Sequence, residues 1–183
     1  MSINFSYRRL SQGELDELLA GSAEIYKKWF GPADLGADDV DDEFEALYER
    51  LEQSKQYLDI NNTWQAIHFL LTDEFCFQGQ SQTPPPLRNV VMGGVPTDIE
   101  TTYGVAFYLT APEVAEAAKG LEPLTVEEMA PRFNAKAFRE AKVYPGNERW
   151  QNDDFEEFAT EYENLRGFFL VAARENQAML LAS

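Results

Sequence analysis

His68 and Cys76 are the only histidine and the only cysteine in the 183-residue chain, and both types can do chemistry. Imidazole transfers protons or binds metals near neutral pH, and a cysteine thiolate is a nucleophile. His68 lies within residues 64–71, which are apolar almost all round, so we expect a buried or half-buried structural histidine with one hydrogen-bond partner; a general base or ligand is the alternative. Cys76 stands between Phe75 and Phe77, which favours a small buried hydrophobe over an activated thiol.

Motifs for metal, phosphate and nucleophilic chemistry are missing from the sequence. One histidine and one cysteine are too few for a zinc site, and the acidic residues 38–45 lack the spacing of a calcium-binding loop. Gly93 and Gly94 belong to no phosphate-binding pattern and predict a turn. There is no nucleophile elbow. We therefore predict no metal and no cofactor. A catalytic carboxylate pair among the 32 acids stays open, so the sequence does not decide whether the protein is an enzyme.

The central helix is the element on which any site would depend. Trp64, Ile67, His68 and Leu71 follow the i, i+3, i+4, i+7 spacing of one helical face. The opposite side is apolar too, which is typical of a buried helix. Residues 59–62 precede it with Asp59, Asn61 and Asn62, any of which could cap its first turn.

Net charge narrows the class of partner. The formal charge is −17, from 32 acids against 15 bases, which argues against binding to nucleic acid or to an anionic membrane surface. Nine acids fall within residues 34–52 and seven within 148–163. Such runs usually form a solvated face, but they also suit a basic protein partner. The sequence shows no signal-peptide core and no apolar run of transmembrane length, so we expect a cytoplasmic protein.

The remaining patterns predict a single α+β domain over residues 1–183, with a small mixed sheet packed with several amphipathic helices. A length of 183 residues and an apolar fraction of 44% suit one globular domain. Helices and strands alternate without a clear βαβ unit, which favours the α+β class. The expected strands cover residues 3–7, 89–92, 103–109 and 178–182; the expected helices cover 15–29, 39–58, 64–71, 110–121, 125–133 and 155–172, with a short one from Asn134.

Four segments carry a resemblance to a known family: L-D-I-N-N-T-W-Q-A-I-H-F-L-L at 58–71, V-M-G-G at 91–94, Y-G-V-A-F-Y-L-T at 103–110 and V-Y-P-G at 143–146. Together with the last helix and the A-M-L-L-A that follows, they resemble the YfbM-like family of small bacterial proteins, whose function is unknown. The resemblance covers nearly the whole chain. It implies a compact α+β domain in the bacterial cytosol and supplies no catalytic residues. Asn61 stands where the family often has an acid.

Two hypotheses for function follow from these observations. The first is a non-enzymatic acidic interaction protein, of the immunity or escort kind, that binds a basic protein partner. The alternative is a small-molecule-binding protein, or an enzyme of unknown reaction, with a pocket near the start of the central helix. The candidate site comprises Trp64, His68, Tyr103 and Tyr144, which match recurrent positions of the resembled family, and Asp59 as the first partner for His68.

Overall fold

A five-stranded sheet organises the computed structural model, which describes residues 3–30, 40–76, 81–101 and 104–183, with the backbone alone for 40–44. The strands lie in the order β2-β1-β5-β4-β3. Their bounds are Ser6–Leu10 for β1, Tyr57–Asp59 for β2, Val95–Thr101 for β3, Gly104–Leu109 for β4 and Ala178–Ala182 for β5. Every pairing among them is antiparallel, so the prediction of a mixed sheet was wrong, while the α+β class is confirmed. The helices between β4 and β5 return the chain to the end of the sheet where β4 finished. β5 therefore starts there and runs antiparallel to β4.

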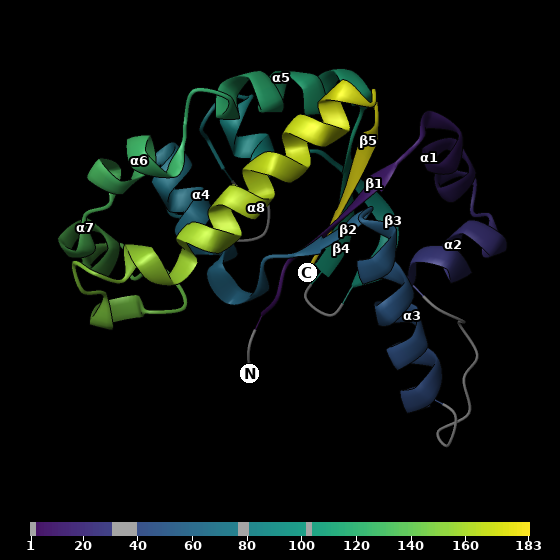
Figure 1. The fold of residues 1–183 in the computed structure, drawn as a ribbon, viewed down its shortest axis with the longest axis horizontal. Helices are drawn as coiled ribbons and strands as arrows, with labels where there is room; N and C mark the ends of the chain where they lie inside the picture. Colours follow the sequence, from purple (N-terminus) through teal and green to yellow (C-terminus); the bar gives the residue numbers. More distant parts are fainter. Residues whose placement is uncertain (1–2, 31–39, 77–80, 102–103) are drawn as a thin grey trace.

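The first face of the sheet carries the larger core. Side chains alternate between the two faces of a strand, and Tyr7, Leu109, Met179 and Leu181 all point to this side. They pack against helices α4 (Trp64–Thr72), α5 (Ala111–Leu121) and α8 (Phe155–Arg174), which lie together on one side of the strands (Figure 1). The short helices α6 (Val126–Met129) and α7 (Ala135–Glu140) lie near the beginning of α8.

The second face is covered by three N-terminal helices, α1 (Gln12–Leu19), α2 (Ala23–Phe30) and α3 (Val40–Ser54) (Figure 1). Its core is smaller and includes Leu10, Trp29, Ala106 and Leu180. These helices lie over one part of the face only, so polar side chains of the sheet remain accessible beside them. Within the described ranges, no helix is long and apolar enough to cross a membrane.

Several predicted element ends are confirmed by their hydrogen bonds. Ser11 and Glu14 form the predicted capping box of α1: Glu14 N donates to Ser11 Oγ at 3.2 Å, and Ser11 N donates to the Glu14 carboxylate at 2.9 Å. Asn134 caps α7 by accepting from Ala137 N at 3.1 Å. The long last helix and the strand at 178–182 also occur as predicted.

Other predicted elements were wrong in ways that local backbone geometry explains. The helix predicted over 15–29 is two helices, because Gly21 adopts a left-handed φ of 77° between them. The helix predicted over 39–58 ends at Ser54, and Leu58 belongs to β2. Residues 89–92 form no strand, since the chain is a 3-10 helix over Leu87–Val90. The edge strand β3 was not predicted at all.

None of the three predicted capping residues caps the central helix. α4 begins at Trp64 after a 3-10 turn over Asn61–Thr63, and no side chain caps it. The Asp59 carboxylate instead accepts from the backbone N–H of Asn61 at 2.6 Å. Asp59 therefore stabilises the turn that follows β2 and does not cap α4.

Candidate functional site

Trp64 and Tyr144 lie together and hold the chain that leads into β1. Their ring centroids are 6.2 Å apart. Trp64 Nε1 donates to the carbonyl of Ile3 at 3.0 Å, and Ile3 N donates to the Tyr144 hydroxyl at 3.1 Å. The Trp64 indole and the Tyr144 hydroxyl thus bond to the carbonyl and the N–H of the same residue, Ile3. Their role is to fix the segment that precedes the sheet.

His68 is fully buried on α4. Burial lowers the pKa of its imidazole to about 4, although the nearby charge of Glu74 acts in the opposite direction. Neither ring nitrogen has a hydrogen-bond partner in the described part of the chain. His68 lines none of the cavities treated below. It is a neutral imidazole in the core at physiological pH. The expected burial is therefore observed, but the expected hydrogen-bond partner is not found among the described residues.

Gln65 is a buried polar residue that the sequence patterns did not single out. Its amide nitrogen donates to the carbonyl of Cys76 at 3.0 Å, and its amide oxygen accepts from Tyr144 N at 2.7 Å. The side chain therefore joins α4 to two loops at once. Cys76 itself is buried, as predicted.

Asp59 lies apart from this cluster, and the predicted site is therefore divided. Trp64, His68 and Tyr144 belong to the core on the first face, whereas Asp59 lines a cavity on the second face. Tyr103 is outside the described residues. The structure thus brings together two of the five predicted residues, Trp64 and Tyr144, in direct ring contact.

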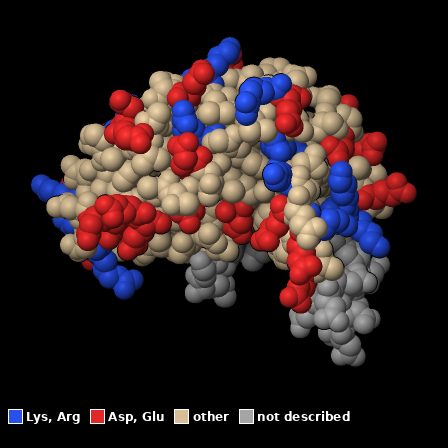
Figure 2. All heavy atoms as spheres, viewed as in Figure 1, with Lys and Arg blue, Asp and Glu red and all other residues tan. Residues whose placement is uncertain are grey.

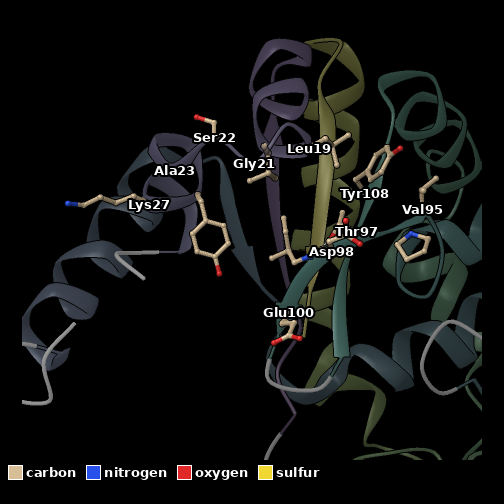
Figure 3. A pocket seen from close by; sticks show the side chains of 14 residues that line it. Leu19, Gly21, Ser22, Ala23, Lys27, Val95, Thr97, Asp98, Glu100 and Tyr108 are labelled. Carbon is tan, nitrogen blue, oxygen red and sulfur yellow. Dashed lines mark hydrogen bonds between the residues drawn. The ribbon is translucent and has the colours of Figure 1, made fainter. Parts of the chain in front are cut away.

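A groove separates α1 and α2 from strand β3, and we call it the β3 groove (Figure 3). Its volume is about 880 Å³. Apolar side chains are unusually accessible here: Leu19 is 46% exposed and Val95 is 42% exposed. The groove is lined by residues of α1, α2 and the turn between them, of β3 and of β4: Leu18, Leu19, Gly21, Ser22, Ala23, Tyr26, Lys27, Val95, Pro96, Thr97, Asp98, Ile99, Glu100 and Tyr108.

The edge strand β3 forms one side of the groove, and its features disfavour pairing with a strand of another chain. Pro96 lacks the N–H needed for pairing, and the register with β4 shifts between Pro96 and Glu100. Asp98 adds an exposed charge. Proline, charge and a bulge are the usual features that keep an edge strand from pairing with other chains. A partner is therefore expected to meet the side chains of the groove and not the strand edge.

A second cavity, of about 480 Å³, surrounds the guanidinium of Arg8, and we call it the Arg8 cavity. Tyr26 and Glu100 line both this cavity and the β3 groove, so the two adjoin each other. Its lining comes from strands β1, β2, β3 and β5 with α2 and α3: Asn4, Ser6, Arg8, Tyr26, Phe30, Tyr48, Tyr57, Asp59, Glu100, Thr101, Ala182 and Ser183.

Arg8 is buried, at 7% exposed, and its contacts hold the guanidinium in one orientation. Its Nε donates to the carbonyl of Trp29 at 3.1 Å, and its Nη1 donates to the hydroxyl of Ser6 at 3.1 Å. The rings of Phe30 and Tyr57 lie 4.6 Å and 5.3 Å from the guanidinium carbon. Among the described residues, Nη2 has no hydrogen-bond partner and no carboxylate lies within 4.0 Å of the guanidinium.

The strand register explains why Arg8 and Asp59 share a cavity. Ser6 pairs with Asp59 and Arg8 pairs with Tyr57 across β1 and β2, so Arg8 and Asp59 are diagonal neighbours on the second face. Burial raises the pKa of the Asp59 carboxyl, against the opposing effects of the Asn61 N–H and the Arg8 charge. Burial also raises the pKa of Tyr57 to about 12. Sequence patterns missed Arg8, because the alternation that signals a strand treats its polar face as solvent-exposed.

A third cavity, of about 570 Å³, lies where the sequence placed a pocket, beside the turn that precedes α4. It is lined by Asn61, Asn62 and Thr63 and by two acids of α8, Glu157 and Glu161. Neither Trp64 nor His68 lines it. Within the described ranges no three His, Cys, Asp or Glu side chains are grouped so as to hold a metal ion.

A five-stranded antiparallel sheet with helices on both faces, and with open cavities on the second face, defines a small α+β domain. Residues 1–182 match the family model of DUF1877, a domain of unknown function, and the chain belongs to this family. The fold is similar to the crystal structure of YfbM from Escherichia coli, a protein of unknown function, with a TM-score of 0.64, 20% identity and 98% of each chain covered. At this identity the likeness shows the fold alone. Among curated proteins, none matches the chain. The resemblance noted in the sequence is thereby confirmed.

Proposed function

We propose that the protein is a non-enzymatic binding protein whose β3 groove receives a basic segment of a protein partner. One observation carries the proposal: Leu19 and Val95 are exposed in a groove whose β3 side bears the acids Asp98 and Glu100. Exposed apolar side chains that gather in a hollow, with charged residues around them, are typical of interaction sites. Acidic side chains beside them select a partner segment that carries lysine or arginine.

The basic residue in the lining does not oppose such a partner. Lys27 points out of the groove and away from the sheet, whereas Glu100 lies at the far end of β3 (Figure 3). The charge that a partner meets inside the groove is therefore negative. Apolar contact with Leu19 and Val95 would supply affinity, and the two acids would supply specificity.

The field of the whole molecule adds to this preference. The net charge is −17, and charges of one sign raise the rate at which an oppositely charged partner arrives. Figure 2 shows acidic side chains gathered near the start of α8. Asp153, just before this helix, and Glu156 and Glu157, in its first turn, are exposed. These acids lie on another part of the surface, so they contribute to attraction without lining the groove.

A binding role, as opposed to a catalytic one, is supported by the position of the reactive side chains. His68 and Cys76 are buried, and neither lines the β3 groove or the Arg8 cavity. A general base or nucleophile must come within hydrogen-bond reach of its substrate. The groove thus offers apolar contact and charge.

Capture of a partner at two salt concentrations tests the proposal. Immobilised protein is mixed with an extract of the native cell at about 0.1 M and at 1 M salt, between which the Debye length falls from roughly 10 Å to 3 Å. We expect a basic protein to be retained at low salt and released at high salt. Asp98→Lys should abolish its capture, and Leu19→Ser should weaken capture without changing the charge.

The control variant is Asp153→Lys, which makes the same charge change just before α8, outside the groove. It should retain the partner nearly as well as the parent protein. Capture that Asp98→Lys and Asp153→Lys reduce equally would show that only net charge matters, and would refute a docking groove. The absence of any salt-sensitive basic protein would refute the function itself.

A further inference from the structure

We propose that the Arg8 cavity binds a small zwitterion of the amino-acid class, whose carboxylate contacts Arg8 and whose ammonium group contacts Asp59. The inference is independent of the proposed function, since it concerns a different cavity and a different kind of ligand. It places a small-molecule site on the second face of the sheet, away from Trp64 and His68.

Arg8 has the properties of a built carboxylate-binding group. A buried cation is costly unless an anion or a set of hydrogen bonds compensates it, and no described carboxylate lies within 4.0 Å. Two hydrogen bonds and two aromatic rings fix the guanidinium plane and leave Nη2 without a described partner. A carboxylate in the cavity would complete this arrangement with a charge-assisted hydrogen bond.

Asp59 supplies the opposite charge in the same cavity. As diagonal neighbours across an antiparallel pair, Arg8 and Asp59 have backbones roughly 7–8 Å apart, and their charged atoms do not form an ion pair. One Asp59 oxygen accepts from Asn61 N, and the second has no described partner. An α-amino acid carries both charges on one carbon, so a single ligand can meet both residues.

Ligands with one kind of charge fit this cavity less well. A purely anionic ligand would face Asp59 and Glu100 together, and like charges at short range are repelled. A purely cationic ligand would leave the Arg8 guanidinium without an anion. Only a ligand with both groups satisfies Arg8 and Asp59 at the same time.

The rest of the lining indicates an apolar or aromatic side chain on the ligand. Tyr26, Phe30, Tyr48 and Tyr57 contribute rings to the cavity, and Tyr48 is half exposed at its edge. Rings of this kind favour apolar and aromatic groups. The volume of about 480 Å³ lies in the range of small-molecule sites.

Titration calorimetry with L-phenylalanine and L-leucine tests this inference, because two derivatives remove one charge at a time. L-phenylalaninamide keeps the ammonium group and lacks the carboxylate, and N-acetyl-L-phenylalanine has the reverse. We expect the zwitterions to bind and each derivative to bind roughly tenfold more weakly or worse, as loss of one charged hydrogen bond requires. An amide that binds as tightly as the amino acid would overturn the inference, as would no binding of either amino acid.

Variants that leave the core intact locate the ligand. Asp59→Asn should weaken binding of L-phenylalanine by roughly tenfold, because its ammonium group loses a charged partner. The same variant should not weaken binding of N-acetyl-L-phenylalanine and should strengthen it, because the repulsion between Asp59 and the ligand carboxylate is removed. Tyr48→Ala, at a half-exposed position, should weaken both. Asp153→Asn, just before α8, is the matched control and should change the affinity of neither ligand. Equal affinities in Asp59→Asn and the parent protein would place the ligand elsewhere and refute the assignment.

The same variants separate this inference from the proposed function. Asp98 lines the β3 groove and not the Arg8 cavity, so Asp98→Lys should abolish capture of the partner while amino-acid binding persists. Asp59→Asn should weaken amino-acid binding while capture of the basic partner persists.

Discussion

Protonation of His68 should make the stability of the protein depend on pH. The imidazole is fully buried, and its pKa is about 4 in the folded chain, below the ordinary histidine value of 6.5. The folded state therefore binds fewer protons than the unfolded state, and acid favours unfolding. The stability due to a neutral His68 is fully present above pH 6.5 and is lost as the pH falls from there towards 4.

The magnitude follows from the difference between the two pKa values. Lowering the pKa of His68 from 6.5 to about 4 corresponds to about 3 kcal/mol of stability lost once the pH is well below both values. About 2 kcal/mol of this should already be lost at pH 5. That is a considerable share of the 5–15 kcal/mol that stabilises an ordinary domain.

Replacement by methionine isolates the contribution of His68 from that of the 32 acids. Neither ring nitrogen has a described partner, so His68→Met should remove no hydrogen bond and leave stability at pH 7 unchanged or higher by about 1 kcal/mol. Urea denaturation of both proteins between pH 5 and 8 measures the difference. The variant should gain about 2 kcal/mol on the parent at pH 5 relative to pH 7.

Two results would refute this reasoning. Parallel stability curves for the two proteins would mean that the pKa of His68 is not lowered. A loss of about 3 kcal/mol or more in His68→Met at pH 7 would mean that the imidazole has a partner, such as a buried water molecule. Because His68 is the sole histidine, its single imidazole resonance gives the folded pKa directly by NMR.

Three further predictions concern the fold. Trp64→Ala should cost about 3–5 kcal/mol, as large-to-small core changes do, and a melting temperature within about 2 °C of the parent would show that the ring is not buried. Gly94→Ala should be destabilising by more than about 1 kcal/mol, because φ is +100° and a Cβ would lie 2.6 Å from a carbonyl oxygen of β4; Gly167→Ala in α8, which meets nothing within 4 Å, is the control and should be neutral or stabilising in urea denaturation. The Glu74 carboxylate accepts from the backbone amides of residues 82–83. These hydrogen bonds, with those from nearby hydroxyls, lower the pKa of Glu74 to about 2. Glu74→Gln should therefore speed hydrogen exchange at both amides, and unchanged exchange rates would contradict the anchoring role of Glu74.

Elements that bury one regular stripe could be predicted from the sequence. The residues of α8 that face the core recur every three or four positions from Phe155 to Ala172, and this spacing predicts both the helix and its buried face. β3 carries no such signal. Its seven residues include a proline and two acids, and none of them is fully buried, so an edge strand there resembles a loop.

The candidate site was harder to predict, because pairing between distant strands creates it. Trp64 and His68 stood out as rare residues in an apolar helix, yet both serve the core. Arg8 resembles a solvent-facing residue of a half-buried strand until α2 and α3 are placed over it. Asp59 was predicted as a partner of His68, but β2 turns it to the opposite face of the sheet. No local pattern records which face a later helix will cover.

The position of β5 bears on how the protein is made in the cell. β5 follows the other four strands in the sequence but lies third in space, hydrogen-bonded to β1 and β4. From the translation of β4 until β5 has been made, that is while residues 110–177 are added, β1 and β4 both lack the neighbour that β5 provides in the finished sheet. The sheet therefore closes after residue 178 has left the ribosomal tunnel, through contacts of large sequence separation that form slowly. A nascent chain with two unpaired strand edges is prone to aggregate, so its yield in the cell should depend on chaperones that shield it until translation has passed β5.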